Sequence, residues 1–257
     1  MKTIILAGGW GSRLGQITEL IPKPMVPIGG KPVLWHIMKI YSHYGFNEFI
    51  ITLGVKGDVI KEYFSKFEIL NNDFSINLDT NKITYHNKHD ETEWKVTLID
   101  TGLNTLKSRR IKLVEKYLDN DINMLTYGDG VADININSLL EFHKNHGKII
   151  TLSGVNAPSR FGELICKGGK VQSFVEKPQM SIGIINGGFM VFNKNLLNYL
   201  SEDDNCDFEF DTLEKLAEAG EVMVYKHKGK WDCMDNERDV QYLNKIWNEN
   251  KAFWKIW

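Results

Sequence analysis

A glycine-rich turn directly follows a short apolar run near the start of this chain. Residues 3–7 (TIILA) are apolar and rich in isoleucine, and two glycines follow them. Such a run predicts a buried strand that feeds a loop. Two cations come next, Arg13 and Lys23, and Lys23 stands between two prolines. A fold that begins in this way must place a glycine loop and two positive charges at the end of an inner strand.

Two familiar phosphate-binding loops do not match this turn. A Walker loop needs a Lys-Ser or Lys-Thr pair after its last glycine, and a dinucleotide fingerprint needs a third glycine where Leu14 stands. A plain strand-to-helix turn is the alternative. The cations favour an anion site, because glycines let backbone N–H groups approach an anion and Arg13 adds a bidentate fork. Lys23 has a stiff backbone on both sides and acts as a fixed point charge, so the segment predicts binding of a nucleoside triphosphate.

The composition narrows the class of protein. With 257 residues, 42% of them hydrophobic and 25% charged, the chain is long enough for one large α/β domain, and we expect residues 1–257 to form a single domain. A formal net charge of −2 gives no basic field for nucleic acid, and no apolar run approaches the roughly 20 residues that span a bilayer. Three widely spaced cysteines without a CxxC or metal-binding pattern fit a reduced, cytoplasmic protein.

Strand and helix patterns alternate through the first third of the chain. The strand pattern at 3–7 is followed by a helix pattern at 33–45, a strand at 48–54 and a helix at 56–64. This order predicts an α/β fold with a parallel sheet and crossover helices. Residues 67–117 carry short alternating pieces and predict a β-rich insert. The α/β pattern then returns, and the last helix begins near Asp235.

Asp129 stands between two glycines after the next predicted strand, residues 122–127. The simpler interpretation is a turn, because GDG is a common turn sequence. However, ligands of parallel α/β sheets bind at the carboxyl ends of the strands, and the flanking glycines open the backbone at this point. We therefore expect Asp129 to contact a ligand at the same edge of the sheet as the glycine loop.

Several motifs resemble the nucleotidylyltransferase signature of the sugar-nucleotide pyrophosphorylases. The order GG-x-G-[ST]-R-L followed by P-K-P is present at residues 8–14 and 22–24. Further matching segments are VKGDVIKEYF, VTLIDTG, TYGDGVAD, RFGEL, VEKP, INGGFMVFN and the tail W..MD..RD..YL...W. The resemblance is close to the glucose-1-phosphate cytidylyltransferases, and it runs from residue 2 to the last tryptophan.

This resemblance implies a nucleotide-diphospho-sugar transferase fold, which is a Rossmann-like mixed, mainly parallel sheet flanked by helices. It also implies Mg²⁺-dependent transfer of a cytidylyl group from CTP to α-D-glucose 1-phosphate, giving pyrophosphate and CDP-glucose for surface-polysaccharide synthesis. A homo-oligomer, with the hexamer as one form, is implied as well. The open alternatives are another acceptor such as a heptose or alditol phosphate, the use of dTTP or UTP, and a catalytically silent subunit that binds nucleotide sugars.

The same resemblance implies roles for individual residues. Catalytic roles fall to Arg13, Lys23, Arg110 and Lys177, and Mg²⁺ ligation falls to Asp129 and Asp235, with Asp232 and Asp239 as neighbouring alternatives. The implied nucleotide-binding residues are Leu6, Ala7, Gly8, Gly9, Gly11, Ser12, Arg13, Lys23, Thr101 and Gly102. The implied sugar-phosphate-binding residues are Tyr127, Gly128, Glu176, Lys177, Asn186 and Gly187.

Four segments depart from the family pattern, and one of them is DTL at 211–213, which replaces the usual EPL before the late helix. The glycine loop has Trp10 and Ser12 where leucine and threonine are common, and LKSRR replaces a TGGR stretch, which leaves Arg109 or Arg110 as the functional arginine. MDN at 234–236 replaces MDT. The sequence therefore constrains the acceptor sugar less than the reaction type. The tryptophan-rich tail WNENKAFWKIW either closes over the fold or meets a neighbouring subunit.

Overall fold

The computed structural model describes residues 1–157, 163–167, 169–175 and 183–257, and a sheet of seven strands forms its centre. These strands are β1 Lys2–Leu6, β4 Glu48–Leu53, β7 Lys95–Asp100, β8 Ile122–Tyr127, β10 Ile150–Val155, β13 Ile185–Asn193 and β14 Val222–Lys226. Their order across the sheet is β14-β10-β13-β8-β1-β4-β7. Neighbouring strands are parallel, except that β13 runs antiparallel to β8 and β10. This mixed, mainly parallel sheet confirms the predicted fold class.

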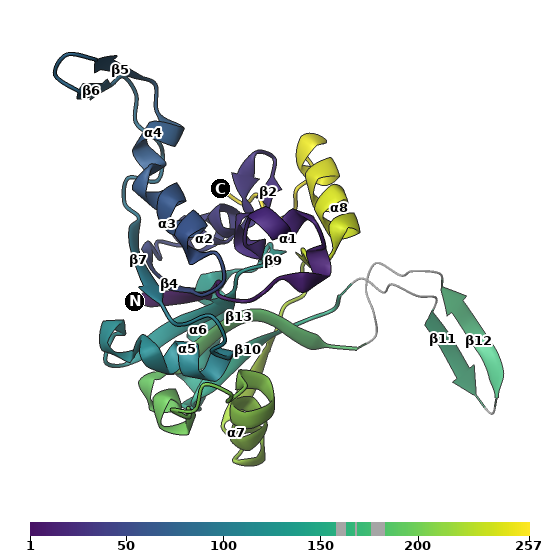
Figure 1. Ribbon diagram of the computed structural model, residues 1–257. Coiled ribbons are helices and arrows are strands. Elements are labelled where there is room, and N and C mark those ends of the chain that lie inside the picture. The colour runs from purple at the N-terminus through teal and green to yellow at the C-terminus, as the bar shows by residue number, and fades with distance from the viewer. Residues whose placement is uncertain (158–162, 168, 176–182) are drawn as a thin grey trace.

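Alternation along the strands builds two hydrophobic cores, one on each face of the sheet. Ile5 and Met124 belong to the first core and their neighbours Ile4 and Leu125 to the second, because successive strand side chains point to opposite faces. The first core is completed by α2 Val33–His43, α3 Gly57–Ser65, α6 Ile136–His146 and α8 Glu237–Asn248, and the second by α5 Lys107–Leu113 and α7 Glu214–Glu218. The sheet thus lies between two helical layers (Figure 1).

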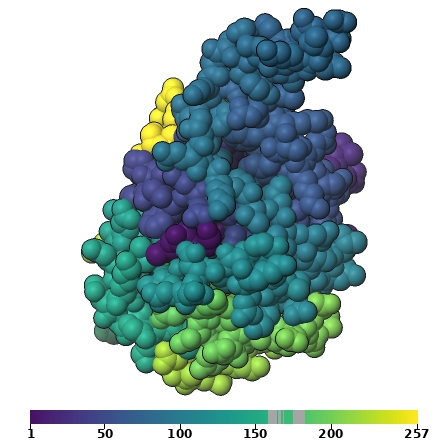
Figure 2. Space-filling view, turned by 90° about the vertical axis from the view of Figure 1, so that its left-hand side faces the viewer, coloured from purple at the N-terminus to yellow at the C-terminus, as the bar shows by residue number. Residues whose placement is uncertain are grey.

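The predicted β-rich insert is smaller in the structure than residues 67–117. Its β-structure is a hairpin of β5 Phe74–Asn77 and β6 Lys82–Tyr85, which follows the short helix α4 Phe67–Asn71. Figures 1 and 2 show this hairpin projecting beyond the rest of the molecule. Strand β7 belongs instead to the main sheet, where it pairs in parallel with β4, and α5 follows it. The alternating pattern therefore predicted the strand correctly but not its partner.

Smaller elements complete the fold. Short two-stranded pairings are β2 Pro27–Ile28 with β3 Lys31–Pro32, β9 Gly130–Ala132 with β15 Trp231–Cys233, and β11 Glu163–Lys167 with β12 Lys170–Val175. Short helical segments are η1 Ser12–Leu14, α1 Ile17–Leu20, η2 Lys23–Met25, η3 Glu115–Tyr117, η4 Lys194–Tyr199 and the π-helical η5 Phe208–Leu213. Of these pairings, β9 with β15 brings Asp129 next to the chain that leads to Asp235. In the part of the chain described here, no helix is long and apolar enough to cross a membrane.

The tryptophan-rich C-terminal tail closes over the fold. Trp254 is fully buried in the first core, and its indole Nε1 donates to His36 Nδ1 at 3.2 Å. His36 Nε2 donates to the Ile28 carbonyl at 2.8 Å. Burial lowers the pKa of His36 to about 4, so the imidazole is neutral and a single tautomer makes both bonds. The tail therefore fastens α2 and the β2–β3 pairing to the end of the chain.

Candidate active site

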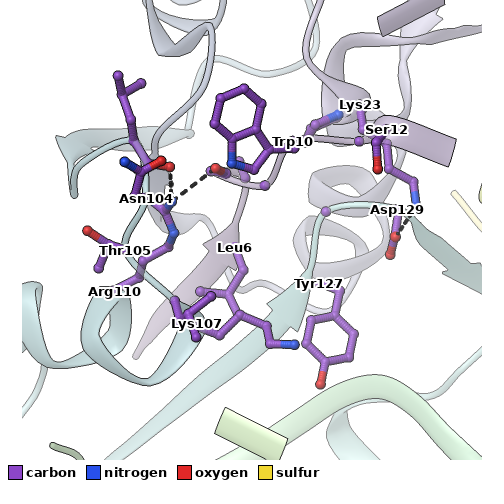
Figure 3. Close-up of a pocket in the computed structure, with 18 of the residues that line it drawn as sticks. Leu6, Trp10, Ser12, Lys23, Asn104, Thr105, Lys107, Arg110, Tyr127 and Asp129 are labelled. Carbon is purple, nitrogen blue, oxygen red and sulfur yellow. Dashed lines mark hydrogen bonds and ion pairs between the residues drawn. The ribbon is translucent and has the colours of Figure 1, made fainter. Parts of the chain in front are cut away.

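A cavity of about 500 Å³ opens at the carboxyl ends of β1 and β8 (Figure 3). Its walls include residues 6–13, 103–107 and 127–129, together with the side chains of Lys23 and Arg110. Because β1 and β8 are parallel neighbours, the loops that follow them meet at one edge of the sheet. The structure thus brings most of the predicted nucleotide-binding residues next to Tyr127, Gly128 and Asp129.

Lys23 is the centre of charge in this cavity. Its Nζ donates to Asp129 Oδ2 at 2.6 Å and to Asp235 Oδ1 at 2.8 Å. Burial alone lowers the pKa of the Lys23 ammonium, but the charge of Asp129 and the hydrogen bonds to both carboxylates outweigh burial, so the pKa is raised. The lysine is therefore fully charged at neutral pH, as its proposed role as a point charge requires.

Gly11 lets the glycine loop pass close to Lys23. Its φ is +64°, and a Cβ at this position would lie 3.1 Å from the Cβ of Lys23. Both constraints favour glycine. Thr18 Oγ1 donates to the Gly11 carbonyl at 3.0 Å and fixes the loop. Beyond this turn Arg13 is largely exposed and forms an ion pair with Asp235, so the two predicted cations share one carboxylate.

Asp129 and Asp235 fit a divalent cation. Their oxygens reach the same Lys23 nitrogen from two segments that the β9–β15 pairing holds together. Two convergent carboxylates that leave room for phosphate oxygens are a typical arrangement for Mg²⁺. The neighbouring Asp239 instead caps α8, because its Oδ2 accepts from the backbone N–H groups of Asp235 and Asn236 at 2.8 and 3.0 Å. Asp235 is therefore better placed than Asp239 as a metal ligand.

Arg110 lies beneath the glycine loop and is only 4% exposed. Its Nη1 donates to the Leu53 carbonyl at 2.9 Å, to Thr101 Oγ1 at 2.6 Å and to the Gly102 carbonyl at 2.9 Å. Its Nη2 donates to the Gly8 carbonyl at 3.0 Å. The guanidinium thus ties together the loops that follow β1, β4 and β7. This geometry supports a positioning role for Arg110, through which Thr101 and Gly102 are held at the border of the cavity.

The predicted acceptor-binding residues within the described part of the chain lie on β8, directly after it, and on β13. Tyr127 lines the cavity, and its hydroxyl donates to Glu209. Asn186 Nδ2 donates to the Tyr127 hydroxyl oxygen at 3.3 Å. The Gly187 carbonyl accepts from the Trp231 indole at 2.8 Å, which links β13 to β15. Glu176 and Lys177 lie outside the described residues.

Three charged residues of the cavity wall, Lys107, Asp207 and Glu209, were not among the predicted site residues. Lys107 is the first residue of α5, and Glu209 lies in η5. Lys107 Nζ is 2.5 Å from Glu209 Oε2 and 3.3 Å from Asp207 Oδ2. The LKSRR departure marked Lys107 as an added charge. Its acidic partners lie far along the chain, just before residues 211–213, and no sequence pattern shows that this segment meets Lys107.

Comparisons with known proteins agree with this geometry. A family model described as nucleotidyl transferase matches residues 2–252. Over 100% of both chains, the sequence is 46% identical to a glucose-1-phosphate cytidylyltransferase of Salmonella typhimurium and 42% identical to a probable glucose-1-phosphate cytidylyltransferase of Bacillus subtilis. The crystal structure of HddC from Yersinia pseudotuberculosis is similar with a TM-score of 0.71 at 25% identity, over 96% of this chain and 99% of HddC. The chain therefore belongs to the nucleotidyl transferase family, within the group of the glucose-1-phosphate cytidylyltransferases.

Proposed function

We propose that this enzyme joins CTP to α-D-glucose 1-phosphate, with CDP-glucose and pyrophosphate as products. The observation that carries the proposal is the meeting of Lys23, Asp129 and Asp235 at a cavity walled by a glycine loop. The relatives at 46% and 42% identity bear names with this activity. The chemistry of the cavity supports nucleotidyl transfer, and the choice of CTP and glucose 1-phosphate rests on these relatives.

The proposed reaction is an in-line displacement at the α-phosphorus of CTP. An oxygen of the acceptor phosphate forms the new P–O bond, and the bond to pyrophosphate breaks with its electron pair leaving on the pyrophosphate oxygen. No side chain has to form a covalent intermediate, so catalysis consists of positioning and charge stabilisation. In this proposal Arg13 and Lys23 bind the triphosphate, and Tyr127 and Asn186 contact the acceptor. By resemblance, Glu176 and Lys177 meet the acceptor's hydroxyls and phosphate.

Mg²⁺ is the divalent cation of this proposal, and members of the family generally use a divalent metal. Asp129 and Asp235 would hold it, and when bound it neutralises charge on the α-phosphate and on pyrophosphate. Both carboxylates are paired with Lys23 in the structure. Lys23 therefore has to exchange carboxylate oxygens for phosphate oxygens when the triphosphate binds. Phosphate oxygens are anionic like the carboxylate oxygens, so they provide Lys23 with the same kind of charge partner after the exchange.

The proposal includes a homo-oligomer, with the hexamer as one form, in the cytoplasm. Exposed apolar side chains on the β5–β6 hairpin support a contact with a second copy: Phe74, Ile76, Leu78 and Tyr85 are between 38% and 82% exposed. An isolated two-stranded hairpin is only marginally stable in water, and a neighbouring copy would stabilise it. Light scattering should give a multiple of the 29.6 kDa chain mass, and a monomer mass would contradict the assembly.

Pyrophosphate release over a grid of nucleoside triphosphates and sugar 1-phosphates, with Mg²⁺, tests the proposed function. We expect the highest kcat/KM for CTP with α-D-glucose 1-phosphate. A higher value with a heptose or alditol phosphate would replace the acceptor but keep the chemistry, and a higher value with UTP or dTTP would replace the nucleotide. An inactive grid, with nucleotide binding still measured by calorimetry, would contradict transfer to these acceptors and would favour an untested acceptor or the silent subunit.

A further inference from the structure

We infer that Glu209 is an acceptor-specificity residue, which presents its carboxylate to hydroxyl groups of the acceptor sugar and is held in place by Lys107. The inference rests on the proposed function and extends it to two residues of the cavity wall. The observation behind it is a continuous chain of contacts from Lys107 through Glu209 and Tyr127 to Asn186, which joins α5, η5, β8 and β13.

Lys107 and Tyr127 hold the Glu209 carboxylate from both of its oxygens. Lys107 Nζ is 2.5 Å from Oε2, and the Tyr127 hydroxyl donates to Oε1. Glu209 remains 31% exposed and Lys107 38% exposed, and both side chains line the cavity. The carboxylate is therefore fixed in orientation, and because Oε2 is buried, a hydrogen bond from a sugar hydroxyl group would be accepted by Oε1.

Tyr127 links Glu209 to Asn186 on the neighbouring strand β13. The Tyr127 hydroxyl has a single proton, and it donates that proton to Glu209 Oε1. Because that proton is donated to Glu209, the hydroxyl oxygen is left to accept, and Asn186 Nδ2 donates to it at 3.3 Å. Asn186 Oδ1 accepts from the Gly188 backbone at 2.9 Å, which fixes the amide. Tyr127 and Glu209 thus place hydrogen-bonding groups in fixed positions at the cavity wall, and Asn186 holds Tyr127 from behind the lining residues.

The part of the cavity wall formed by Lys107, Asp207 and Glu209 repels phosphate groups but can accept hydrogen bonds from hydroxyl groups. Lys107 is shared between two carboxylates, Glu209 and Asp207, so the three side chains carry a net negative charge. The cations expected to meet phosphate, Arg13 and Lys23, are paired instead with Asp129 and Asp235. Ionised carboxylates only accept hydrogen bonds. A neutral, hydroxyl-rich group therefore fits beside Glu209, and the phosphates fit at the Lys23 end.

The place of the wall in the sheet favours the acceptor sugar over the nucleobase. Glu209 contacts Tyr127 of β8, which Asn186 of β13 also contacts, and the resemblance assigns both of these residues to the acceptor. Its other partner, Lys107, begins α5 directly after the 101–106 segment, which follows β7 and lies closer to the expected nucleotide side. The exocyclic amino group of cytosine is also a hydrogen-bond donor and is the competing partner for Glu209. A test must therefore separate loss of acceptor recognition from loss of nucleotide recognition.

The experiment compares Glu209→Gln with Glu214→Gln, a matched loss of charge at an exposed position of α7. KM is measured separately for glucose 1-phosphate and for CTP, with UTP and a set of monodeoxy glucose 1-phosphates as further substrates. We expect Glu209→Gln to raise the acceptor KM by about tenfold to hundredfold, the usual size for a hydrogen bond to a charged group. The CTP KM and all parameters of Glu214→Gln should stay within about twofold.

One deoxy analogue should react poorly with the wild type and no longer be discriminated by Glu209→Gln, which would identify the hydroxyl group that Glu209 binds. An unchanged acceptor KM, or a fall in the preference for CTP over UTP instead, would overturn the inference. Failure of the proposed function is a different result, because the wild type itself would then be inactive with CTP and glucose 1-phosphate.

Lys107 is tested as a positioning residue through Glu209. Lys107→Met should raise the acceptor KM with little change in kcat. Lys107→Arg should keep the acceptor KM near the wild-type value, because an arginine at this position can still hold the Glu209 carboxylate. In the Glu209→Gln background, Lys107→Met should have no further effect on that KM. Equal effects in both backgrounds, with unchanged thermal unfolding, would show that Lys107 acts independently of Glu209 and would overturn this part of the inference.

Discussion

At the scale of single residues, Lys23 explains most about the site. Pro22 and Pro24 fix its backbone, the left-handed Gly11 lets the loop pass beside it, and both predicted metal ligands converge on its ammonium group. The same group that balances the two carboxylates in the structure is the one expected to balance the triphosphate. A substitution at this position should therefore affect substrate binding and transition-state charge together.

We predict that Lys23→Ala lowers kcat/KM for CTP by about a hundredfold to a thousandfold, the size seen when one preorganised electrostatic contact is removed. Both kcat and KM should change, because the ammonium contacts the triphosphate in the ground state and in the transition state. Steady-state kinetics against Lys61→Ala, an exposed lysine of α3, checks this. Turnover near the wild-type value in Lys23→Ala would rule out the role.

Asp129→Asn and Asp235→Asn should each lose Mg²⁺-dependent activity while the protein stays folded. Each change removes one of two charged oxygen ligands, and an amide binds a hard divalent cation more weakly than a carboxylate does. Circular dichroism reports the fold, and a Mg²⁺ titration of activity reports the apparent metal affinity. If either variant saturated at the wild-type Mg²⁺ concentration, that aspartate would not be a metal ligand.

At the scale of elements, strand and loop motifs near the site were readable from the sequence, and long-range contacts were not. The apolar run before Gly8 and the strand before Asp129 gave β1 and β8, and glycines marked the loops that follow. Residues 94–100 also predicted a strand, but alternation does not reveal a partner, and β7 joined the main sheet. Alternation specifies which face of a strand is buried, and register with β4 depends on the rest of the fold.

The arginine of α5 shows the same limit for side chains. The sequence indicated that Arg109 or Arg110 is functional, but the acceptors of Arg110 come from loops after β1, β4 and β7. A charged residue in a polar stretch is expected at the surface, and only the assembled loops provide the carbonyl oxygens that allow its burial. Its position beneath the loop could therefore be found only from the structure.

We predict that Arg110→Met lowers the free energy of unfolding by about 3 kcal/mol, because it removes the hydrogen bonds of a buried guanidinium group to Gly8, Leu53, Thr101 and Gly102. Arg109→Met is the matched control. Arg109 is 24% exposed and its ion pair with the exposed Asp204 is 3.6 Å long, so its loss should cost below about 1 kcal/mol. Urea unfolding measures both. An inactive Arg110→Met variant with wild-type stability would mean that Arg110 acts on the triphosphate directly.

At the scale of the whole molecule, the C-terminal tail and the first core are held together by a neutral histidine. The pKa of His36 is lowered to about 4 by burial, against 6.5 for the free side chain, and the nearby charges of Lys255 and Lys31 act in the same direction. The unfolded chain therefore binds a proton between these pH values that the folded chain does not bind. The contribution of His36 to the free energy of unfolding is therefore fully present above pH 6.5, and it is lost as the pH falls toward 4.

The free energy of unfolding should therefore fall between pH 7 and pH 4.5, with a contribution from His36 of at most about 3 kcal/mol. In His36→Gln the protein should be less stable at pH 7 but its stability should depend less on pH. Urea unfolding across this range, with His86→Gln on the exposed hairpin as control, measures the difference. Equal pH slopes in wild type and His36→Gln would show that His36 does not carry this dependence.

In the proposed reaction, this chain transfers a cytidylyl group with the help of a divalent cation held by Asp129 and Asp235. Phosphorus NMR of the wild-type protein with CTP, α-D-glucose 1-phosphate and Mg²⁺ tests it most directly. We predict CDP-glucose and pyrophosphate in equal amounts, no product after addition of a chelator, and recovery when excess Mg²⁺ is restored. Equal product formation in the presence of the chelator, or no CDP-glucose although both substrates bind, would contradict the claim.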